Sequence, residues 1–216
     1  VIDADPNRIE LLWRRMYSSG YALRPDPTLV GVMSGIEMAC WDIVGKDAGK
    51  PVYDLLGGRV HERIRTYTYL YPADGRPDVY TDAAQAAEQA AVEVDRGFTA
   101  LKFDPAGPYT AFDGHQPSLD DIDRSVAITG AIREAVGSRA DLLFGTHGQF
   151  TAAGAIRLAQ RLERFDPLWF EEPTQPDQPE EMAKVARQTS IPVATGERLT
   201  TITEFAALAR HQAAAI

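Results

Sequence analysis

Ile64-Arg65-Thr66-Tyr67-Thr68-Tyr69 begins the stretch that decides the fold, because alternating β-branched and aromatic residues are typical of a β-strand. From this point on, predicted strands and helices alternate strictly along the chain. Such alternation predicts parallel strands joined by right-handed crossovers. The expected strands cover residues 64–69, 100–103, 142–144, 168–170 and 191–194, and the expected helices cover residues 80–96, 119–136, 151–164, 179–188 and 201–209.

The length of this alternating part narrows the choice among parallel folds. A complete (β/α)₈ barrel takes about 250 residues, so residues 64–216 suffice for about five of its eight units. The last residues, Ala213-Ala214-Ala215-Ile216, predict the start of a sixth buried strand. The first strand–helix turn lacks the Gly-x-Gly-x-x-Gly of a dinucleotide-binding fold. We therefore expect an α/β fold, a TIM-type barrel that is incomplete in this chain, with an open sheet as the alternative.

Helices are expected before the first strand. Asp5 as an N-cap and Pro6 at the first helical position predict a helix over residues 6–17. A long, mostly apolar helix is expected over residues 28–48, and a short helical turn over 52–56. The long helix should have a wide buried face made of Leu29, Val32, Met33, Ile36, Cys40, Ile43 and Val44.

The composition excludes several classes of partner. With 22 basic and 31 acidic residues the chain carries a net charge of −9, which argues against nucleic-acid binding and against a polybasic membrane anchor. The sequence contains no run of 18 apolar residues, so no membrane-spanning helix is expected. The single cysteine, Cys40, cannot form an internal disulfide, which suits a reducing compartment. We expect a cytoplasmic protein.

Ionisable residues follow four consecutive predicted strands. In a parallel barrel the carboxyl ends of the strands meet at one mouth, so these side chains should converge there. Carboxylates clustered at one mouth repel each other, and a cation such as Mg²⁺, which keeps several waters and few protein ligands, would relieve the repulsion. The residues concerned are Lys102 and Asp104, His147, Glu171 and Glu172, and Glu197 with Arg198.

Several ordered motifs resemble the mandelate racemase/muconate lactonizing enzyme branch of the enolase superfamily. This resemblance implies that residues 1–58 are the C-terminal part of an α+β capping domain and that residues 59–216 are the first part of a barrel domain. It also implies a Mg²⁺ enzyme that abstracts a proton next to a carboxylate and forms an enediolate. The motifs are Ser34-Gly35-Ile36-Glu37-Met38-Ala39-Cys40-Trp41-Asp42-Ile43, Pro51-Val52-Tyr53-Asp54-Leu55-Leu56-Gly57-Gly58, Trp169-Phe170-Glu171-Glu172-Pro173 and Gly196-Glu197-Arg198.

The resemblance assigns Glu171 and Glu197 as metal ligands, but the third ligand is missing. Relatives place an aspartate at the end of the third strand, where this chain has Gly145. The alternatives are a weaker metal site, His147 as an imidazole ligand, or Asp104 as a substitute. The base that takes the α-proton in relatives is expected beyond Ile216.

A second departure follows the second strand. Relatives with racemase activity carry Lys-x-Lys there, whereas this chain has Lys102-Phe103-Asp104. Lys102 is interpreted as a catalytic residue that holds the substrate carboxylate or stabilises the enediolate, or else as a lysine paired with Asp104 or a glutamate. Asp104 and Arg198 are candidate substrate-binding residues, although Arg198 could instead pair with Glu171.

His147 points to the class of reaction. In sugar-acid dehydratases of the family, a histidine at this position is the acid that expels the β-hydroxyl, a role that suits a group titrating near neutrality. A metal-ligand role and a structural role are the alternatives. The resemblance thus implies a Mg²⁺-dependent sugar-acid dehydratase, most similar to those acting on galactonate or mannonate, and a homo-oligomer. A racemase, epimerase or cycloisomerase, or a non-catalytic member with a decayed metal site, are the competing interpretations.

Overall fold

A computed structural model describes residues 2–19, 26–72, 77–107 and 114–216. The chain divides into two compact units. The first comprises Val1–Ile64 with Arg198–Ile202, and the second comprises Arg65–Glu197 with Thr203–Ile216. The domain boundary expected after Gly58 stays a prediction.

The first unit consists of helices α1 (Ile9–Ser18), α2 (Pro27–Asp47) and α3 (Val52–Leu55). Helix α2 begins at Asp26, whose carboxylate accepts hydrogen bonds from the backbone N–H groups of Thr28 and Leu29. The expected start of α1 was wrong by three residues, because Asp5 caps a separate turn by accepting from the Asn7 backbone N–H at 2.9 Å.

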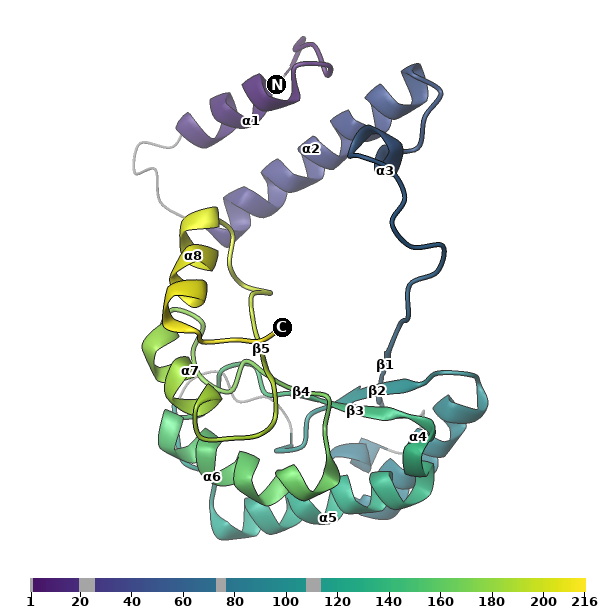
Figure 1. Cartoon of the computed structure of the whole chain (residues 1–216), viewed down its shortest axis with the longest axis vertical. Coiled ribbons are helices and arrows are strands. Elements are labelled where there is room, and N and C mark those ends of the chain that lie inside the picture. The colour runs from purple at the N-terminus through teal and green to yellow at the C-terminus, as the bar shows by residue number, and fades with distance from the viewer. Residues whose placement is uncertain (1, 20–25, 73–76, 108–113) are drawn as a thin grey trace. The chain divides into compact units, whose positions relative to one another are not determined.

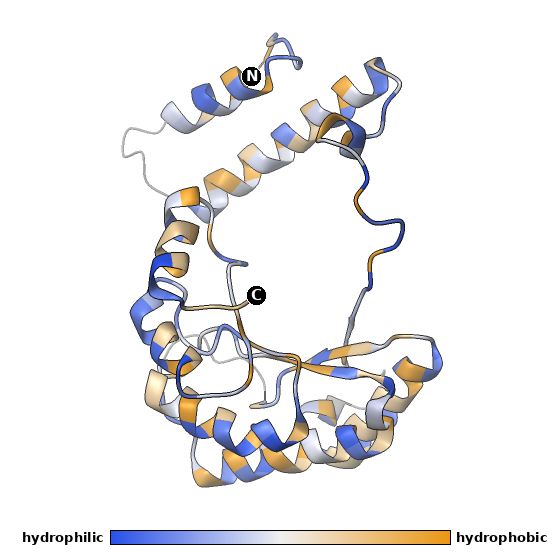
Figure 2. Cartoon of the chain, viewed as in Figure 1, coloured by the Kyte–Doolittle hydropathy of each residue, from blue (hydrophilic) through white to orange (hydrophobic). Residues whose placement is uncertain are grey.

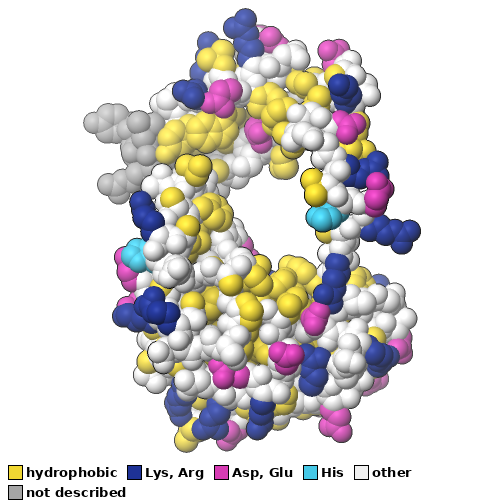
Figure 3. Space-filling model, viewed as in Figure 1, with side chains coloured by type: hydrophobic (Ala, Val, Ile, Leu, Met, Phe, Trp, Pro, Cys, Tyr) yellow, Lys and Arg dark blue, Asp and Glu magenta, His cyan; other side chains and the backbone are white. Residues whose placement is uncertain are grey.

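Helix α2 is less buried than its sequence predicts. Met33 and Cys40 are buried, whereas Val32 and Ile43 are 60% and 46% exposed, so the expected wide buried face is wrong. Figure 3 shows hydrophobic side chains on the surface over α1 and α2. By length and composition alone, α2 could also cross a membrane, a property that core helices of soluble proteins share. The search for an uninterrupted run of 18 apolar residues did not find this helix, because Glu37 and Asp42 lie within it.

The second unit is built on a five-stranded parallel sheet with the order β1-β2-β3-β4-β5 (Figure 1). Each strand pairs with the next strand along the chain, as in a barrel wall. The expected first strand was too long, because β1 pairs with β2 only at Thr68 and Tyr69. The strands are β1 (Thr68–Tyr69), β2 (Ala100–Phe103), β3 (Asp141–Gly145), β4 (Trp169–Glu171) and β5 (Val193–Ala194).

Helices connect successive strands, and α4, α5 and α6 lie along one face of the sheet (Figure 1). The first turns of these three helices are capped by Asp82, Ser118 and Thr151, whose side chains accept backbone hydrogen bonds. The described residues also form 3₁₀ turns at Pro77–Tyr80, Gly137–Arg139 and Glu163–Phe165. The helices are α4 (Ala83–Asp95), α5 (Leu119–Val136), α6 (Ala152–Leu162), α7 (Pro179–Ala186) and α8 (Ile202–His211).

The core lies between the sheet and these helices. Phe144 and Phe170 from neighbouring strands are fully buried, and their ring centroids are 6.4 Å apart at an interplanar angle of 85°. Figure 2 shows hydrophobic strands beside helices whose surfaces carry both hydrophobic and hydrophilic residues. Parallel strands in a barrel are apolar for this reason, since helices cover them on the outside.

The last residues of the chain pair with β5. The Val193 carbonyl accepts from the Ala215 backbone N–H at 2.8 Å, and the Thr195 backbone N–H donates to the Ile216 carbonyl at 3.2 Å. Residues 215 and 216 therefore lie where a sixth strand would continue the sheet. The expected fold class, an α/β structure containing part of a TIM-type barrel, is confirmed.

Candidate active site at the carboxyl ends of the strands

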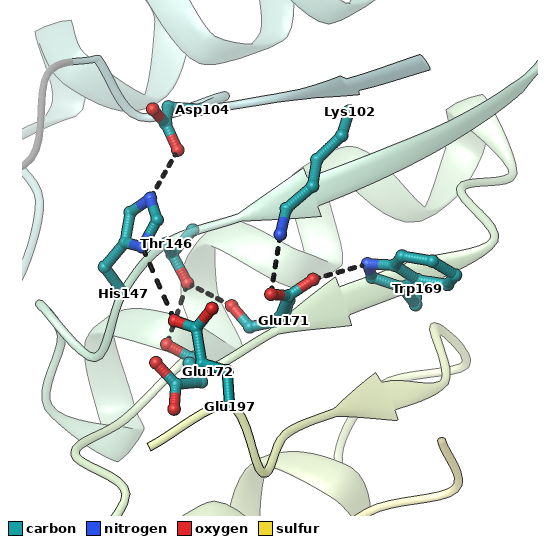
Figure 4. Close-up of polar contacts among 8 residues, drawn as sticks. All are labelled: Lys102, Asp104, Thr146, His147, Trp169, Glu171, Glu172 and Glu197. Carbon is teal, nitrogen blue, oxygen red and sulfur yellow. Dashed lines mark hydrogen bonds and ion pairs between the residues drawn. The ribbon is translucent and has the colours of Figure 1, made fainter. Parts of the chain in front are cut away.

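The carboxyl ends of β2, β3, β4 and β5 bring together the predicted site residues of the second unit (Figure 4). Lys102 and Asp104 come from the end of β2 and His147 from the turn after β3. Glu171 ends β4 and Glu197 follows β5. The first four of these side chains are at most 29% exposed, and Glu197 is 46% exposed.

Lys102 and Glu171 form a buried ion pair across the sheet. Lys102 Nζ lies 2.6 Å from Glu171 Oε1, and the side chains are 7% and 15% exposed. The other oxygen, Glu171 Oε2, accepts a hydrogen bond from Trp169 Nε1 at 3.0 Å. Both carboxylate oxygens therefore have a donor, as a buried charge requires. Of the two pairings expected for Lys102, the structure has the one with a glutamate.

Two tyrosine rings also face the Lys102 ammonium. Lys102 Nζ lies 5.8 Å from the ring centroids of both Tyr67 and Tyr69, within the range of a cation–π interaction. Tyr69 also donates a hydrogen bond from its hydroxyl to Asp104. Burial, followed by this hydrogen bond, raises the pKa of Tyr69 far above its usual range, so the hydroxyl remains a donor at physiological pH.

His147 lies between two carboxylates. Its Nε2 is 3.1 Å from Asp104 Oδ1, and its Nδ1 is 3.8 Å from Glu197 Oε1. The hydrogen bond to Asp104 raises the pKa of His147 above its usual value, and the charges of Asp104 and Glu197 add to the rise. Partial burial and the Lys102 charge oppose it. The net effect favours the imidazolium, which can donate a proton.

The backbone around His147 adopts a conformation that is rare for residues with a side chain. His147 has φ of 53° and Glu172, at the end of the neighbouring strand, has φ of 43°. Each such residue costs about 1–3 kcal/mol, and such residues cluster at functional sites. Thr146 holds the two turns together, because its buried hydroxyl lies 2.9 Å and 3.0 Å from the carbonyl oxygens of Glu171 and Glu172.

Gly145 leaves room that neighbouring side chains fill. A Cβ at this position would lie 3.0 Å from Lys102 Cε, 3.3 Å from Asp104 Oδ1 and 3.5 Å from the Tyr69 hydroxyl. Where relatives are expected to place an aspartate, this chain therefore has the stem of Lys102 and the carboxylate of Asp104. The three alternatives for the missing ligand stay predictions.

The described residues do not fit a divalent cation in the arrangement that they adopt. Among them, no group of three or more His, Cys, Asp or Glu side chains lies close enough together to hold a metal ion. Glu171 also has the Lys102 ammonium as its counter-ion. A cation bound there would require this ion pair to open.

The remaining expectations concern residues outside this cluster. Arg198 belongs to the first unit, and its substrate-binding role stays a prediction. The loop Pro105–Pro117 has a length that allows it to cover the site, but its residues 108–113 lie outside the described residues. Beyond them, His115 packs its ring on Phe150 with centroids 5.5 Å apart.

Reasoning from the sequence missed four contributors to the site. Tyrosines that alternate in a strand are typical core residues, so Tyr67 and Tyr69 did not stand out, and Trp169 appeared only as part of a motif. The alternation of Tyr67 and Tyr69 on one face of a strand beside Lys102 was the available signal for the tyrosines. No local signal pointed to Thr146, whose partners lie on another strand.

Family models match almost the whole chain. The model described as the N-terminal domain of mandelate racemase/muconate lactonizing enzyme matches residues 1–57. The model described as enolase C-terminal domain-like matches residues 85–216. The chain belongs to the enolase superfamily. Within it, the first match places the chain in the mandelate racemase/muconate lactonizing enzyme branch, and the expected resemblance is confirmed.

Two curated proteins whose names state a substrate are similar to this chain. The D-galactonate dehydratase of Ralstonia nicotianae (strain ATCC BAA-1114 / GMI1000) is 37% identical over 205 residues, which are 95% of this chain and 50% of that protein. The D-gluconate/D-galactonate dehydratase of Picrophilus torridus is 35% identical over 199 residues, 92% of this chain and 48% of that protein. The chain thus spans about half the length of the curated relatives it matches.

A solved structure of the enolase superfamily supports the fold. The mandelate racemase/muconate lactonizing enzyme structure from Labrenzia alexandrii DFL-11 is 65% identical to this chain, with a TM-score of 0.92. The match covers 98% of this chain and 54% of that one. The five parallel strands therefore correspond to part of a larger enolase-type barrel.

Proposed function

We propose that the full-length protein is a sugar-acid dehydratase. It would remove the α-proton of a sugar acid to give an enediolate and expel the β-hydroxyl, so that one proton and one hydroxide leave as water. The observation that carries the proposal is the position of His147 at the barrel mouth between Asp104 and Glu197. The pKa of His147 is raised above its usual value, which favours the protonated form. The names of the galactonate and gluconate dehydratase relatives support the same reaction.

In the proposed reaction His147 is the acid. The imidazolium donates its proton to the departing β-hydroxyl, which turns a poor leaving group into water. Asp104 is a positioning residue in this step, because its carboxylate fixes the ring through Nε2 and is itself fixed by the Tyr69 hydroxyl. The base that takes the α-proton is expected beyond Ile216.

Lys102, Asp104 and Arg198 remain candidates for contact with the substrate. A sugar acid carries a carboxylate and several hydroxyls, which an ammonium, a carboxylate and a guanidinium can bind. The sequence Lys102-Phe103-Asp104 lacks a second lysine, which counts against the racemase, epimerase and cycloisomerase interpretations.

The proposed cofactor is Mg²⁺, with Glu171 and Glu197 as the residues that would hold it once the Lys102–Glu171 ion pair had opened. Members of the enolase superfamily generally use this ion, and the chain belongs to that superfamily. When bound, a divalent cation stabilises the negative charge that develops on the substrate carboxyl group as the α-proton leaves. We further propose a cytoplasmic homo-oligomer that binds neither nucleic acid nor membranes.

The test is the substitution His147→Asn in the full-length protein, assayed on D-galactonate and D-gluconate. Turnover should fall by about 10²–10⁴-fold, the usual contribution of a general acid. Exchange of the substrate α-proton with deuterated solvent and the affinity for Mg²⁺ should both survive. The matched control is His211→Asn on α8, a histidine whose Nε2 lies 3.3 Å from Glu180 Oε1, and it should leave turnover within about twofold, as expected of a residue with no part in the chemistry.

Two other outcomes would assign His147 differently. If Mg²⁺ affinity, α-proton exchange and dehydration all fall together, His147 is a metal ligand. If none of the three changes, His147 is structural and the dehydratase proposal loses its support.

A non-catalytic member of the superfamily is the second candidate function. Gly145 in place of a ligand and the Lys102–Glu171 ion pair favour this interpretation. Calorimetric titration of the full-length protein with Mg²⁺ separates the two, because a decayed site binds no metal and supports no turnover.

A further inference from the structure

The hydroxyl of Thr146 connects the turn after β3 to two consecutive carbonyl groups at the end of β4. Thr146 is fully buried, and its Oγ1 lies 2.9 Å from the Glu171 carbonyl oxygen and 3.0 Å from the Glu172 carbonyl oxygen. Figure 4 shows both contacts. Hydrogen bonds tolerate little change in distance and angle, so a hydroxyl shared by two acceptors on another strand restricts the turn that carries it.

These contacts are not needed to satisfy the two carbonyl groups. The Glu171 carbonyl also accepts from the Thr146 backbone N–H at 3.1 Å, and the Glu172 carbonyl accepts from the Gly148 backbone N–H at 2.7 Å. Loss of the hydroxyl would therefore leave neither buried acceptor without a donor, and an unsatisfied buried group is the main cost of a lost hydrogen bond. The hydroxyl thus serves the geometry of the turn.

His147 lies between the two residues that these bonds hold. Thr146 and Gly148 flank it, and both donate hydrogen bonds to the end of β4. His147 itself has a left-handed backbone with φ of 53°, a conformation that persists only where the surroundings determine it. From this backbone its Nε2 reaches Asp104 Oδ1 at 3.1 Å. The position of the imidazole therefore depends on the turn that Thr146 fastens to β4.

We propose that Thr146 is a positioning residue for His147. Its hydroxyl fastens the turn after β3 to the end of β4 and so fixes where the imidazole lies when it donates a proton to the substrate. The inference rests on the proposed function, because it takes His147 as the acid of the dehydration. A misplacement of about 1 Å can slow catalysis by about 10²-fold, so a contact away from the reacting atoms can control turnover.

The experiment compares full-length Thr146→Val, Thr146→Ser and Thr129→Val with the parent. Valine keeps the branched shape of threonine and removes the hydroxyl, whereas serine keeps the hydroxyl. Thr129 on α5 is the matched control, because it is also fully buried and its hydroxyl has no hydrogen-bond partner among the described residues. The kcat for D-galactonate or D-gluconate should fall by about 10–100-fold in Thr146→Val and should stay within about threefold of the parent in the other two variants.

Two further measurements separate positioning from a general loss of structure. KM and the rate of α-proton exchange should stay within about twofold in Thr146→Val, because a displaced acid affects only the step that expels the hydroxyl. In crystals of full-length Thr146→Val, His147 Nε2 should lie more than about 3.5 Å from Asp104 Oδ1, beyond hydrogen-bond distance. Thr146→Ser and Thr129→Val should keep this contact.

Three results would overturn the proposal. The first is an unchanged kcat in Thr146→Val, and the second is α-proton exchange that falls together with kcat. If Thr146→Val does not fold, Thr146→Cys replaces it, because a thiol is a weak hydrogen-bond donor. The third result is that neither variant folds, since the hydroxyl is then needed for the fold itself.

The outcome is distinguishable from failure of the proposed function. A displaced His147 in Thr146→Val, in a protein whose parent dehydrates neither galactonate nor gluconate, supports the positioning and refutes the dehydratase. An undisplaced His147 with unchanged kcat, in a protein whose parent dehydrates a sugar acid, refutes the positioning and leaves the dehydratase standing.

Discussion

At the scale of single residues, Gly145 leaves space into which the side chains of Lys102 and Asp104 extend. The sequence predicted that a ligand would be missing there, because glycine has no side chain to offer. It could not predict that Lys102 and Asp104 would fill the space, since their contacts depend on the register between β2 and β3. The pairing of Lys102 with Glu171, 69 residues apart, likewise depends on the folded sheet.

Glu197 is the more accessible of the two proposed metal-binding glutamates. Its side chain is 46% exposed and makes a 3.8 Å contact with His147. Glu197→Gln removes one negative charge from the proposed site and should abolish the rise in melting temperature that Mg²⁺ gives the full-length protein. Glu181→Gln on α7, a glutamate paired with Lys184, is the matched control and should keep that rise. An equal Mg²⁺-dependent shift in Glu197→Gln and the parent would mean that Glu197 does not bind the ion.

Elements with strong local signals were predicted well. The bounds of β2 and α5 are those expected, because turn residues flank β2 and an N-cap residue precedes the helical pattern of α5. Strand β1 is shorter than expected because its extent depends on a partner, and pairing stops at Thr68. The exposure of α2 could not be read from its apolar residues, because burial depends on what packs against them.

The start of α5 offers a test at the scale of one element. Ser118 and Asp121 form a capping box, in which Ser118 Oγ accepts from the Asp121 backbone N–H at 3.1 Å and the Asp121 carboxylate accepts from the Ser118 backbone N–H at 3.2 Å. Ser118→Ala should lower the free energy of unfolding by about 1 kcal/mol at neutral pH. Chemical denaturation of the full-length protein measures this change.

The Ser118–Asp121 pair should also make the free energy of unfolding depend on pH in a defined direction. The hydrogen bond from Ser118 holds the pKa of Asp121 below its usual value of 3.8. Because the folded pKa is depressed, the contribution is present above pH 3.8 and is lost as pH falls through the folded value. The difference in free energy of unfolding between the parent and Ser118→Ala should therefore shrink in acid. Thr151→Ala is the control, because Thr151 caps α6 by accepting from the Gly154 backbone N–H. Its difference in free energy of unfolding from the parent should not shrink in acid.

At the scale of the whole molecule, the sequence predicted the type of fold and the edge of the sheet that carries the candidate site. Parallel alternation fixes that edge, because every strand then ends at the same mouth. The contacts within the mouth were not predictable, since they join residues from different strands that lie far apart in the sequence. The chain also spans about half of its relatives, so the sheet described here has five strands and a sixth that begins at residues 215–216.

The 216-residue segment should not behave as an isolated monomer. Strand β1 has a ladder partner on one side in the described sheet, and β5 is extended on its outer side only by residues 215–216. Unpaired edges of this kind pair with other chains, and a barrel removes them only when it closes. Exposed apolar side chains such as Val32 and Met38, at 60% and 63%, add to the tendency. Light scattering coupled to size exclusion should therefore find assemblies or aggregates of the segment, whereas the full-length protein should give one defined species. A segment that stays monomeric, melts cooperatively and dehydrates a sugar acid would contradict the prediction, because its five strands would then suffice for both the fold and the activity.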